Sequence, residues 1–172
     1  MCVRIRRAMD AGVTDEAQVL ERRPVKGRPT SPKRRDTMRR ASSVEIDDAI
    51  RIEVERRLDE ARDAIAGFHG VPLDGREGAG FIRYPDGGHY KPHRDRAVVA
   101  SWPGAAHRKI AVVVFLNSGG FTGGTLRVFL DASPVDVQPK AGLLVAFPAA
   151  ALHEVTTVRG GVRDAIVDWF TG

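Results

Sequence analysis

The sequence contains a single cysteine, Cys2, so no disulfide can form within the chain. A scarcity of cysteine is typical of proteins in a reducing intracellular compartment. The chain also lacks a long hydrophobic run, because the apolar stretch Ile110–Leu116 is far shorter than the roughly 20 residues that cross a bilayer. The basic N-terminus has no apolar stretch of the kind that marks a secretion signal. These absences predict a cytoplasmic protein without a membrane segment.

What the chain has in excess is positive charge, and that charge is concentrated near the N-terminus. Residues 1–42 hold 12 Lys and Arg against 5 Asp and Glu, whereas the remaining residues hold 15 against 17. Residues 22–40 are rich in Pro, Gly, Ser, Lys and Arg, a composition typical of disordered tails. We therefore predict a basic, disordered tail over 1–42 and one folded domain over 43–172. Such a tail could contact phosphates of a nucleic acid, but it has no aromatic residues for base stacking, which disfavours that partner.

A helix is predicted directly after this tail. Ser42 to Glu45 has the Ser-x-x-Glu form of a capping box, which satisfies free backbone N–H groups at a helix start. Apolar residues then recur at spacings of three and four, which places them on one face of a helix that ends near Gly67 to Gly70. These residues are Ile50, Val54, Leu58, Ala61, Ile65 and Phe68. A single amphipathic helix needs a partner surface, and the second half of the chain predicts a sheet.

From Gly78 onward, short apolar segments alternate with glycine-rich turns, a pattern that predicts strands. The predicted strands are Gly80–Tyr84, Lys109–Leu116, Thr125–Phe129, Gly142–Phe147, His153–Val158 and Val162–Phe170. Ile110–Leu116 is nearly all apolar and β-branched, as expected for a strand that is buried on both faces. One helix against six or more short strands favours a mainly β fold with a supporting helix, a sandwich or a barrel-like jelly roll.

The residues most suited to chemistry are His93 and Asp95, followed 58 residues after Asp95 by His153. Residues i and i+2 of a strand point to the same face, so His93 and Asp95 would present an imidazole and a carboxylate to one point. If the sheets fold over each other, His153 can complete the set. Two histidines and one carboxylate on one side of a metal ion leave the opposite positions open, as in non-haem Fe(II) oxygenases. A His-x-Asp pair alone is a weak signal.

Arg163, ten residues after His153, strengthens the metal-site hypothesis. We expect it on the strand next to that of His153. Activation of dioxygen at iron(II) requires an electron source, and a 2-oxo acid supplies two electrons by oxidative decarboxylation. The far carboxylate of that acid needs an anchor, and arginine is suitable because its planar fork donates two parallel hydrogen bonds and stays charged when buried. On its own, Arg163 could equally be a surface residue paired with Asp164 or Asp168.

Several segments together resemble the prolyl 4-hydroxylase-like oxygenases, over roughly residues 44–172 and in the same order. These segments are Tyr84–Asp95, Phe115–Asn117, Phe121–Phe129, Val137–Lys140, His153–Val155 and Arg163–Phe170. The nearest group is the hypoxia-inducible-factor prolyl hydroxylases and their bacterial relatives. The resemblance implies a double-stranded β-helix (jelly roll, cupin-like), with Fe(II) bound by His93, Asp95 and His153 and the distal carboxylate of the co-substrate 2-oxoglutarate bound by Arg163. It leaves open a role for ascorbate.

The resemblance also implies finer features of the co-substrate pocket. Tyr84 matches a tyrosine that lines this pocket in the animal enzymes, although it could equally be a core residue, and Tyr90 is interpreted as a packing residue. A second tyrosine of the animal enzymes falls at Val114, so one hydrogen bond to 2-oxoglutarate would be missing, and Thr125 is a candidate to replace it. Four apolar strand residues are expected to form a dry wall of the pocket. They are Val112, Val114, Leu144 and Ala146.

The function implied by the resemblance is a dioxygenase that hydroxylates a substrate and releases succinate and carbon dioxide, with a prolyl residue of a protein or peptide as the preferred substrate. A hydroxylase of a free amino acid or another small molecule would share the chemistry. A nucleic-acid demethylase would typically carry a second arginine six residues after the first, where this chain has Trp169. A non-catalytic, cupin-like metal-binding protein is a further alternative, although neither a ligand nor Arg163 is lost. The sequence does not indicate the oligomeric state.

Overall fold

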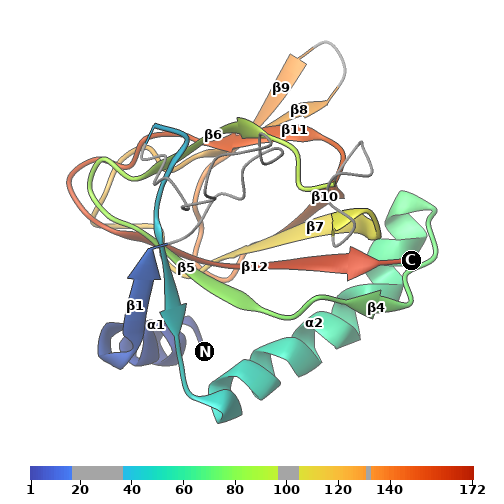
Figure 1. Cartoon of the computed structure of the whole chain (residues 1–172), viewed down its shortest axis with the longest axis horizontal. Coiled ribbons are helices and arrows are strands. Elements are labelled where there is room, and N and C mark those ends of the chain that lie inside the picture. The colour runs from blue at the N-terminus through green and yellow to red at the C-terminus, as the bar shows by residue number, and fades with distance from the viewer. Residues whose placement is uncertain (17–36, 97–104, 131–132) are drawn as a thin grey trace, which may run out of the picture.

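The computed structural model describes residues 1–16, 37–96, 105–130 and 133–172. These residues form two β-sheets that face each other and two helices that cover the outer face of the larger sheet (Figure 1). The helices are α1 (Cys2–Ala11) and α2 (Asp48–His69). Neither of these two helices is long and apolar enough to cross a membrane.

The larger sheet has the strand order β1-β3-β5-β12-β7-β10, with β4 paired to β12, and the smaller sheet has the order β2-β6-β11-β8-β9. The strands of the larger sheet are β1 (Val13–Glu16), β3 (Ser42–Glu45), β4 (Gly75–Arg76), β5 (Gly80–Tyr84), β7 (Arg108–Phe115), β10 (Leu144–Pro148) and β12 (Arg163–Thr171). Those of the smaller sheet are β2 (Arg39–Arg40), β6 (His89–His93), β8 (Leu126–Leu130), β9 (Ser133–Val137) and β11 (Leu152–Val155). The neighbouring strands pair antiparallel, and the two stacked sheets form the predicted double-stranded β-helix.

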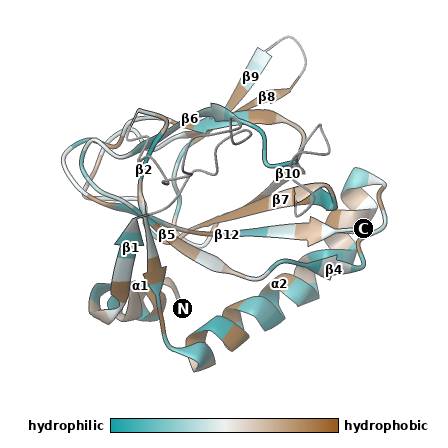
Figure 2. Cartoon of the chain, in the orientation of Figure 1, coloured by the Kyte–Doolittle hydropathy of each residue, from teal (hydrophilic) through white to brown (hydrophobic). Residues whose placement is uncertain are grey.

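Two layers of apolar side chains hold the sheets and helices together. The outer layer, between the larger sheet and the helices, includes Leu58 of α2 and Val112 of β7. The inner layer, between the two sheets, includes Phe115 of β7 and Val128 of β8. Strand β7 contributes to both layers because successive side chains point to opposite faces, and Figure 2 shows it as hydrophobic over most of its length. The prediction of a strand buried on both faces is confirmed.

Helix α2 begins later than predicted, because the predicted capping box is part of a strand. Ser42–Glu45 forms β3, which pairs with β1 on one side and β5 on the other. Val44 of this strand is 2% exposed, so burial as well as pairing favours the extended conformation. The helix is capped instead by Asp47, whose side chain accepts a hydrogen bond from the backbone N–H of Ala49 at 2.8 Å.

The apolar face of α2 is confirmed over most of its length. Val54, Leu58 and Ile65 are buried against the larger sheet. The prediction is wrong for Phe68, which lies in the last turn and is 86% exposed. The predicted end of the helix is confirmed, since Gly70 follows it with φ 64°, a left-handed conformation that glycine adopts without steric cost.

The prediction of a disordered tail over 1–42 is wrong for residues 2–16 and for residues 39–42, which include β2 and the start of β3. Helix α1 buries Ile5 and Met9, each 1% exposed, in the outer apolar layer. Strand β1 pairs with β3 along its whole length. The basic residues around these two apolar positions obscured a short amphipathic helix that needs the sheet to be stable. Residues 17–36 lie outside the described residues, so the prediction for them stays a prediction.

The substitution Ile5→Ala tests whether α1 is part of the folded domain. Because Ile5 is 1% exposed, we expect the free energy of unfolding to fall by about 2–5 kcal/mol. Val3→Ala is the matched control, since Val3 is 66% exposed and its truncation should change the stability by less than about 0.5 kcal/mol. Urea unfolding curves of both variants give these values. Equal stability of the two variants would mean that α1 does not dock on the sheet.

Candidate metal centre

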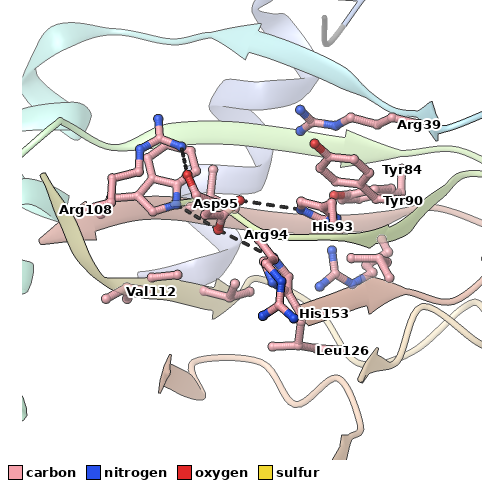
Figure 3. Close-up of a pocket in the computed structure, with 16 residues that line it drawn as sticks. Arg39, Tyr84, Tyr90, His93, Arg94, Asp95, Arg108, Val112, Leu126 and His153 are labelled. Atoms are coloured by element: carbon pink, nitrogen blue, oxygen red, sulfur yellow. Dashed lines mark hydrogen bonds and ion pairs between the residues drawn. The ribbon is translucent and has the colours of Figure 1, made fainter. Parts of the chain in front are cut away.

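His93, Asp95 and His153 meet in the space between the two sheets (Figure 3). One ligand atom from each residue can be chosen so that all three lie within 4.8 Å of one another. Nε2 of His93 lies 3.5 Å from one carboxylate oxygen of Asp95, and Nε2 of His153 lies 3.4 Å from the other. Within the described part of the chain, no other group of three or more His, Cys, Asp or Glu side chains comes together in this way. The structure thus unites the three residues that the sequence singled out.

The pairing of two strands explains why these side chains converge. Strands β6 and β11 are antiparallel neighbours in which His93 lies directly opposite His153, so both imidazoles point to the same face. Their ring centroids are 4.2 Å apart. Asp95 lies two residues beyond the end of β6, where its backbone N–H donates to the carbonyl oxygen of Ala149 at 3.0 Å. This hydrogen bond fixes the turn that carries the carboxylate.

Each imidazole is oriented by a nearby backbone carbonyl. Nδ1 of His93 lies 2.8 Å from the carbonyl oxygen of Lys91, and Nδ1 of His153 lies 3.0 Å from that of Ala151. A carbonyl oxygen only accepts hydrogen bonds, so in a neutral imidazole Nδ1 carries the proton and Nε2 presents its lone pair. Both Nε2 atoms face Asp95. A hydrogen bond of this kind on the second ring nitrogen is typical of metal-binding histidines.

The protonation states of these side chains also suit a cation. Burial acts to raise the pKa of Asp95, but the hydrogen bond from His93, the charges of the two histidines and the indole N–H of Trp169 outweigh it and lower the pKa to about 2. Burial lowers the pKa of His153. Near neutral pH the carboxylate is therefore ionised and the His153 imidazole is neutral, which are the forms that bind metal ions.

Arg163 enters the same cavity from the opposite sheet. The prediction that its strand lies next to that of His153 is wrong, because β11 belongs to the smaller sheet and β12 lies between β5 and β7 in the larger one. The guanidinium Cζ of Arg163 lies 4.9 Å from the ring centroids of both Tyr84 and Phe115. Its side chain is fully buried, and among the described residues its Nε and Nη2 have no hydrogen-bond partner.

This unpartnered guanidinium edge is the most unusual polar feature of the cavity. Burial lowers the pKa of Arg163 although Tyr84 and Asp164 act to raise it, and burial of donors that lack a hydrogen-bond partner is energetically unfavourable. The Nε–H and the neighbouring terminal N–H of a guanidinium lie on one edge and match the two oxygens of a carboxylate. Gly124 leaves space for this side chain, because a Cβ atom at position 124 would lie only 2.7 Å from Cδ of Arg163. The cavity therefore presents a buried site for a carboxylate.

Of the other two residues predicted for the co-substrate pocket, Tyr84 lines the cavity and Thr125 does not. Tyr84 lies opposite Arg163 in the β5–β12 pair, is 3% exposed and lines the cavity. Thr125 is not among the residues that line the cavity. Its hydroxyl donates to Oε1 of Gln138 at 3.1 Å, and its backbone N–H donates to the hydroxyl of Thr156 at 3.0 Å. The structure brings Tyr84, and not Thr125, to the arginine.

The predicted apolar wall is largely on the wrong face of the larger sheet. Val114, Leu144 and Ala146 pack in the outer layer beneath the helices, and of the four predicted residues Val112 is the one that also lines the cavity. The apolar side chains that line it from inside come from both sheets. They are Ala111, Val113, Leu126, Val155 and Val167. Phe115, and not Val114, is the β7 residue in contact with Arg163, and it has no hydroxyl to donate.

Trp169 contacts the candidate metal-ligand cluster, and the sequence analysis did not assign it to the site. Its indole Nε1–H donates to Oδ2 of Asp95 at 2.8 Å, the same carboxylate oxygen that faces His153. The guanidinium of Arg108 packs 3.7 Å from the centre of its ring. The sequence could have predicted this position. Trp169 follows Arg163 by an even number of residues on one strand, so the two side chains lie on the same face.

The cavity has a volume of about 260 Å³. Tyr90, interpreted from sequence as a packing residue, forms part of its wall and stacks on His93, with ring centroids 3.4 Å apart and planes 16° from parallel. Arg39, Arg94 and Arg108 complete the polar lining together with the residues already described. The candidate metal-binding triad and the buried guanidinium of Arg163 thus share one cavity.

Comparison with known proteins agrees with this geometry. The family model described as "2OG-Fe(II) oxygenase superfamily" matches residues 79–171, more than half of the chain. A PKHD-type hydroxylase of Nitrobacter winogradskyi is 34% identical over 93 residues, which are 52% of this chain and 41% of that protein. A PKHD-type hydroxylase of Shewanella baltica is 26% identical over 155 residues, 88% of this chain and 69% of that protein. For the Nitrobacter protein and two other PKHD-type hydroxylases, this chain covers only 39–41% of the relative's length.

Two solved structures show the same fold. A prolyl-4-hydroxylase of Pseudomonas putida superposes with a TM-score of 0.64 at 29% identity, over 80% of this chain and 74% of that one. A prolyl hydroxylase of Trichoplax adhaerens, in complex with a hypoxia inducible factor oxygen degradation domain peptide fragment, gives a TM-score of 0.69 over 99% of this chain and 74% of that one. The second likeness is at 20% identity and bears on the fold alone.

Proposed function

Because the chain belongs to the 2OG-Fe(II) oxygenase superfamily, we propose that it is an Fe(II)- and 2-oxoglutarate-dependent dioxygenase that hydroxylates a prolyl residue of a protein or peptide. The observation that carries the proposal is the unpartnered edge of Arg163, buried in the same cavity as His93, Asp95 and His153. A metal-binding protein without co-substrate has no use for a buried, unpaired guanidinium. A 2-oxo dicarboxylate gives that edge its partner.

The residues present fit the iron and the co-substrate. Two imidazole nitrogens and one carboxylate form the donor set that non-haem iron(II) takes in oxygenases, and they leave part of the ion's surface open. We assign these roles to His93, Asp95 and His153, and assign to Arg163 the far carboxylate of 2-oxoglutarate. When bound, iron(II) and 2-oxoglutarate supply the oxidation of a C–H bond by dioxygen, with release of succinate and carbon dioxide.

The chain's own contribution is to orient these groups and to exclude water. The carbonyl groups beside His93 and His153 fix the imidazole tautomers, and Trp169 holds the carboxylate of Asp95. The rings of Tyr84 and Phe115 pack against the guanidinium of Arg163, which lines the cavity. Apolar side chains from both sheets make the surroundings dry, which strengthens each electrostatic contact.

A prolyl substrate is supported by the names of the similar proteins. The Pseudomonas putida structure, at 29% identity, is that of a prolyl-4-hydroxylase. Several curated relatives are PKHD-type hydroxylases. Since the chain spans only part of those relatives, the substrate is a proposal that needs its own test.

That test is an assay of purified protein with Fe(II), 2-oxoglutarate and proline-containing peptides. We expect iron-dependent release of succinate and one added oxygen atom on a prolyl residue, detected by mass spectrometry. Metal binding without any succinate would favour the cupin-like metal-binding alternative. Oxygen added to free amino acids but to no peptide would favour the small-molecule alternative.

The substitution Trp169→Phe tests the role of the indole N–H. Phenylalanine keeps an aromatic ring beside Arg108 but cannot donate to Asp95, so we expect the affinity for a divalent metal ion to fall about 10–100-fold. Tyr90→Phe is the matched control, since it keeps the stack on His93 and removes a hydroxyl that has no hydrogen bond within the described residues. Titration with Mn(II) measures both variants. An unchanged affinity in Trp169→Phe would remove Trp169 from the site.

A further inference from the structure

The cavity carries more positive charge than the proposed reaction needs. Among the described residues that line it, Arg39, Arg94, Arg108 and Arg163 are cationic, and Asp95 is the one carboxylate. The proposed function assigns a dianionic co-substrate and iron(II) to this space. Three negative charges, those of the co-substrate and Asp95, then balance iron(II) and Arg163. Iron(II) and 2-oxoglutarate therefore provide no negative charge to balance Arg39, Arg94 and Arg108.

Two of these three arginines also lack a described acidic partner. Arg108 is paired with Glu77, with 2.5 Å between the nearest nitrogen and oxygen. Arg94 is exposed and donates to the backbone carbonyl of Ala150. Arg39 makes no ion pair with any described residue, and its Nε is buried without a hydrogen-bond partner. Leaving a buried donor unpaired is unfavourable, so an acceptor from outside the chain would stabilise it.

Arg39 is close to the metal centre because of strand pairing. It lies directly opposite Tyr90 in the β2–β6 pair, and its guanidinium Cζ is 4.7 Å from the centre of the Tyr90 ring. The same ring stacks on His93 at 3.4 Å. The Tyr90 ring therefore lies between the Arg39 guanidinium and His93, a proposed iron ligand, as Figure 3 shows. A group bound to Arg39 would therefore lie in the same cavity as the proposed iron ligands.

We propose that Arg39 binds a carboxylate of the substrate next to the hydroxylated carbon. This inference rests on the proposed function and names the class of substrate, an acidic one. Guanidinium is the side chain best suited to bind a carboxylate through two hydrogen bonds. The carboxylate has two possible sources, an Asp or Glu beside the target proline of a peptide or the free carboxylate of an amino acid. The chemistry of recognition is the same for both.

The test measures the preference of the protein for negative charge in matched pairs of ligands. The protein is loaded with Mn(II) and N-oxalylglycine, an unreactive analogue of 2-oxoglutarate, and binding is followed by tryptophan fluorescence. One pair consists of blocked peptides with Glu-Pro-Glu or Gln-Pro-Gln at the centre. The other pair is L-proline and L-prolinamide, which differ in the carboxylate. A preference in the first pair identifies a peptide source and a preference in the second identifies a free amino acid.

We expect the wild-type protein to bind the acidic member of one pair about tenfold or more tightly than the neutral member, the ratio expected for one hydrogen-bonded charge pair. In Arg39→Ala this ratio should fall below about threefold. Arg40→Ala is the matched control, since Arg40 lies next along β2, is exposed and does not line the cavity, and it should keep the wild-type ratio.

Two results would overturn the inference: no preference in either pair with the wild-type protein, or a preference that Arg39→Ala retains. A failure of the proposed function is distinguishable from both. It would appear as no iron-dependent succinate release by the wild-type protein, which is measured without any of these ligands.

Discussion

Substitution of His153 by alanine is expected to lower the affinity for a divalent metal ion by on the order of 10²–10³-fold. Structural sites with four ligands bind zinc with about 10–16 kcal/mol, or roughly 3 kcal/mol per ligand, and each 1.4 kcal/mol is a factor of ten. His153 is 5% exposed and supplies one of only three ligand atoms in the cluster, so solvent cannot easily replace it. Anaerobic titration with Fe(II) or Mn(II) measures the affinity, and succinate release should fall with it.

The control for this substitution is His89→Ala. His89 lies at the start of β6, the strand that ends with His93, but it does not line the cavity. Its Nδ1 is hydrogen-bonded to the carbonyl oxygen of Gly87. We expect metal affinity and succinate release of His89→Ala to be close to those of the wild-type protein. If both histidine variants lose metal equally, the loss is one of folding, and if neither does, the metal lies elsewhere.

The substitution Arg163→Met is expected to separate co-substrate binding from stability. Truncating one partner of a buried, hydrogen-bonded charge pair costs about 2–5 kcal/mol, so the affinity for 2-oxoglutarate should fall on the order of 10²-fold or more. Without co-substrate, however, the guanidinium edge is unpaired in the described structure and its burial is unfavourable. Methionine has a similar length and no charge.

The metal-free and co-substrate-free Arg163→Met protein should therefore be at least as stable as the wild type. A gain of roughly 1–4 kcal/mol is in the range seen when buried ions are replaced by hydrophobic residues. Arg159→Met is the control, since Arg159 is exposed and precedes β12 by a few residues, and it should leave 2-oxoglutarate binding unchanged. Thermal unfolding with and without 2-oxoglutarate measures both effects. A variant that is less stable but still binds 2-oxoglutarate would show that Arg163 is a structural residue.

Two of the three candidate metal ligands could be predicted from one short segment of the sequence. His93 and Asp95 are two residues apart, and the backbone needs only an extended segment and a fixed turn to bring them together. The strand assignments succeeded for the same reason, since glycine-rich turns bound short apolar segments such as Gly80–Tyr84, which is a strand with these bounds in the structure. Local patterns therefore indicated the strands and the His93–Asp95 pair, whereas His153 and the double-stranded β-helix were assigned through the resemblance to the prolyl 4-hydroxylase-like oxygenases.

The face of a strand could not be predicted where both faces are apolar. Along β7 every residue from Ile110 to Phe115 is hydrophobic, so no alternation distinguishes the side toward the cavity from the side toward the helices. Three of the four predicted wall residues, Val114, Leu144 and Ala146, were therefore assigned to the wrong face. The contact between Phe115 and Arg163 depends on this register, and only the folded sheet reveals it.

The sequence also could not predict which strands pair when they lie far apart in the chain. Nothing local indicates that β12 lies between β5 and β7, so the sheet that carries Arg163 was misassigned. The segment 2–16 is stabilised by contacts with the sheet and by pairing with β3, whereas its own sequence interrupts its apolar residues with charged ones and has no long apolar run. Tertiary packing outweighed the compositional signal there.

The most direct test of the account is a crystal structure of the protein with Mn(II) and 2-oxoglutarate, grown without oxygen. We expect one metal ion bound by His93, Asp95 and His153, and the far carboxylate of 2-oxoglutarate on Nε and Nη2 of Arg163. An ion bound by other residues, or a carboxylate that leaves the edge of Arg163 unpaired, would contradict it.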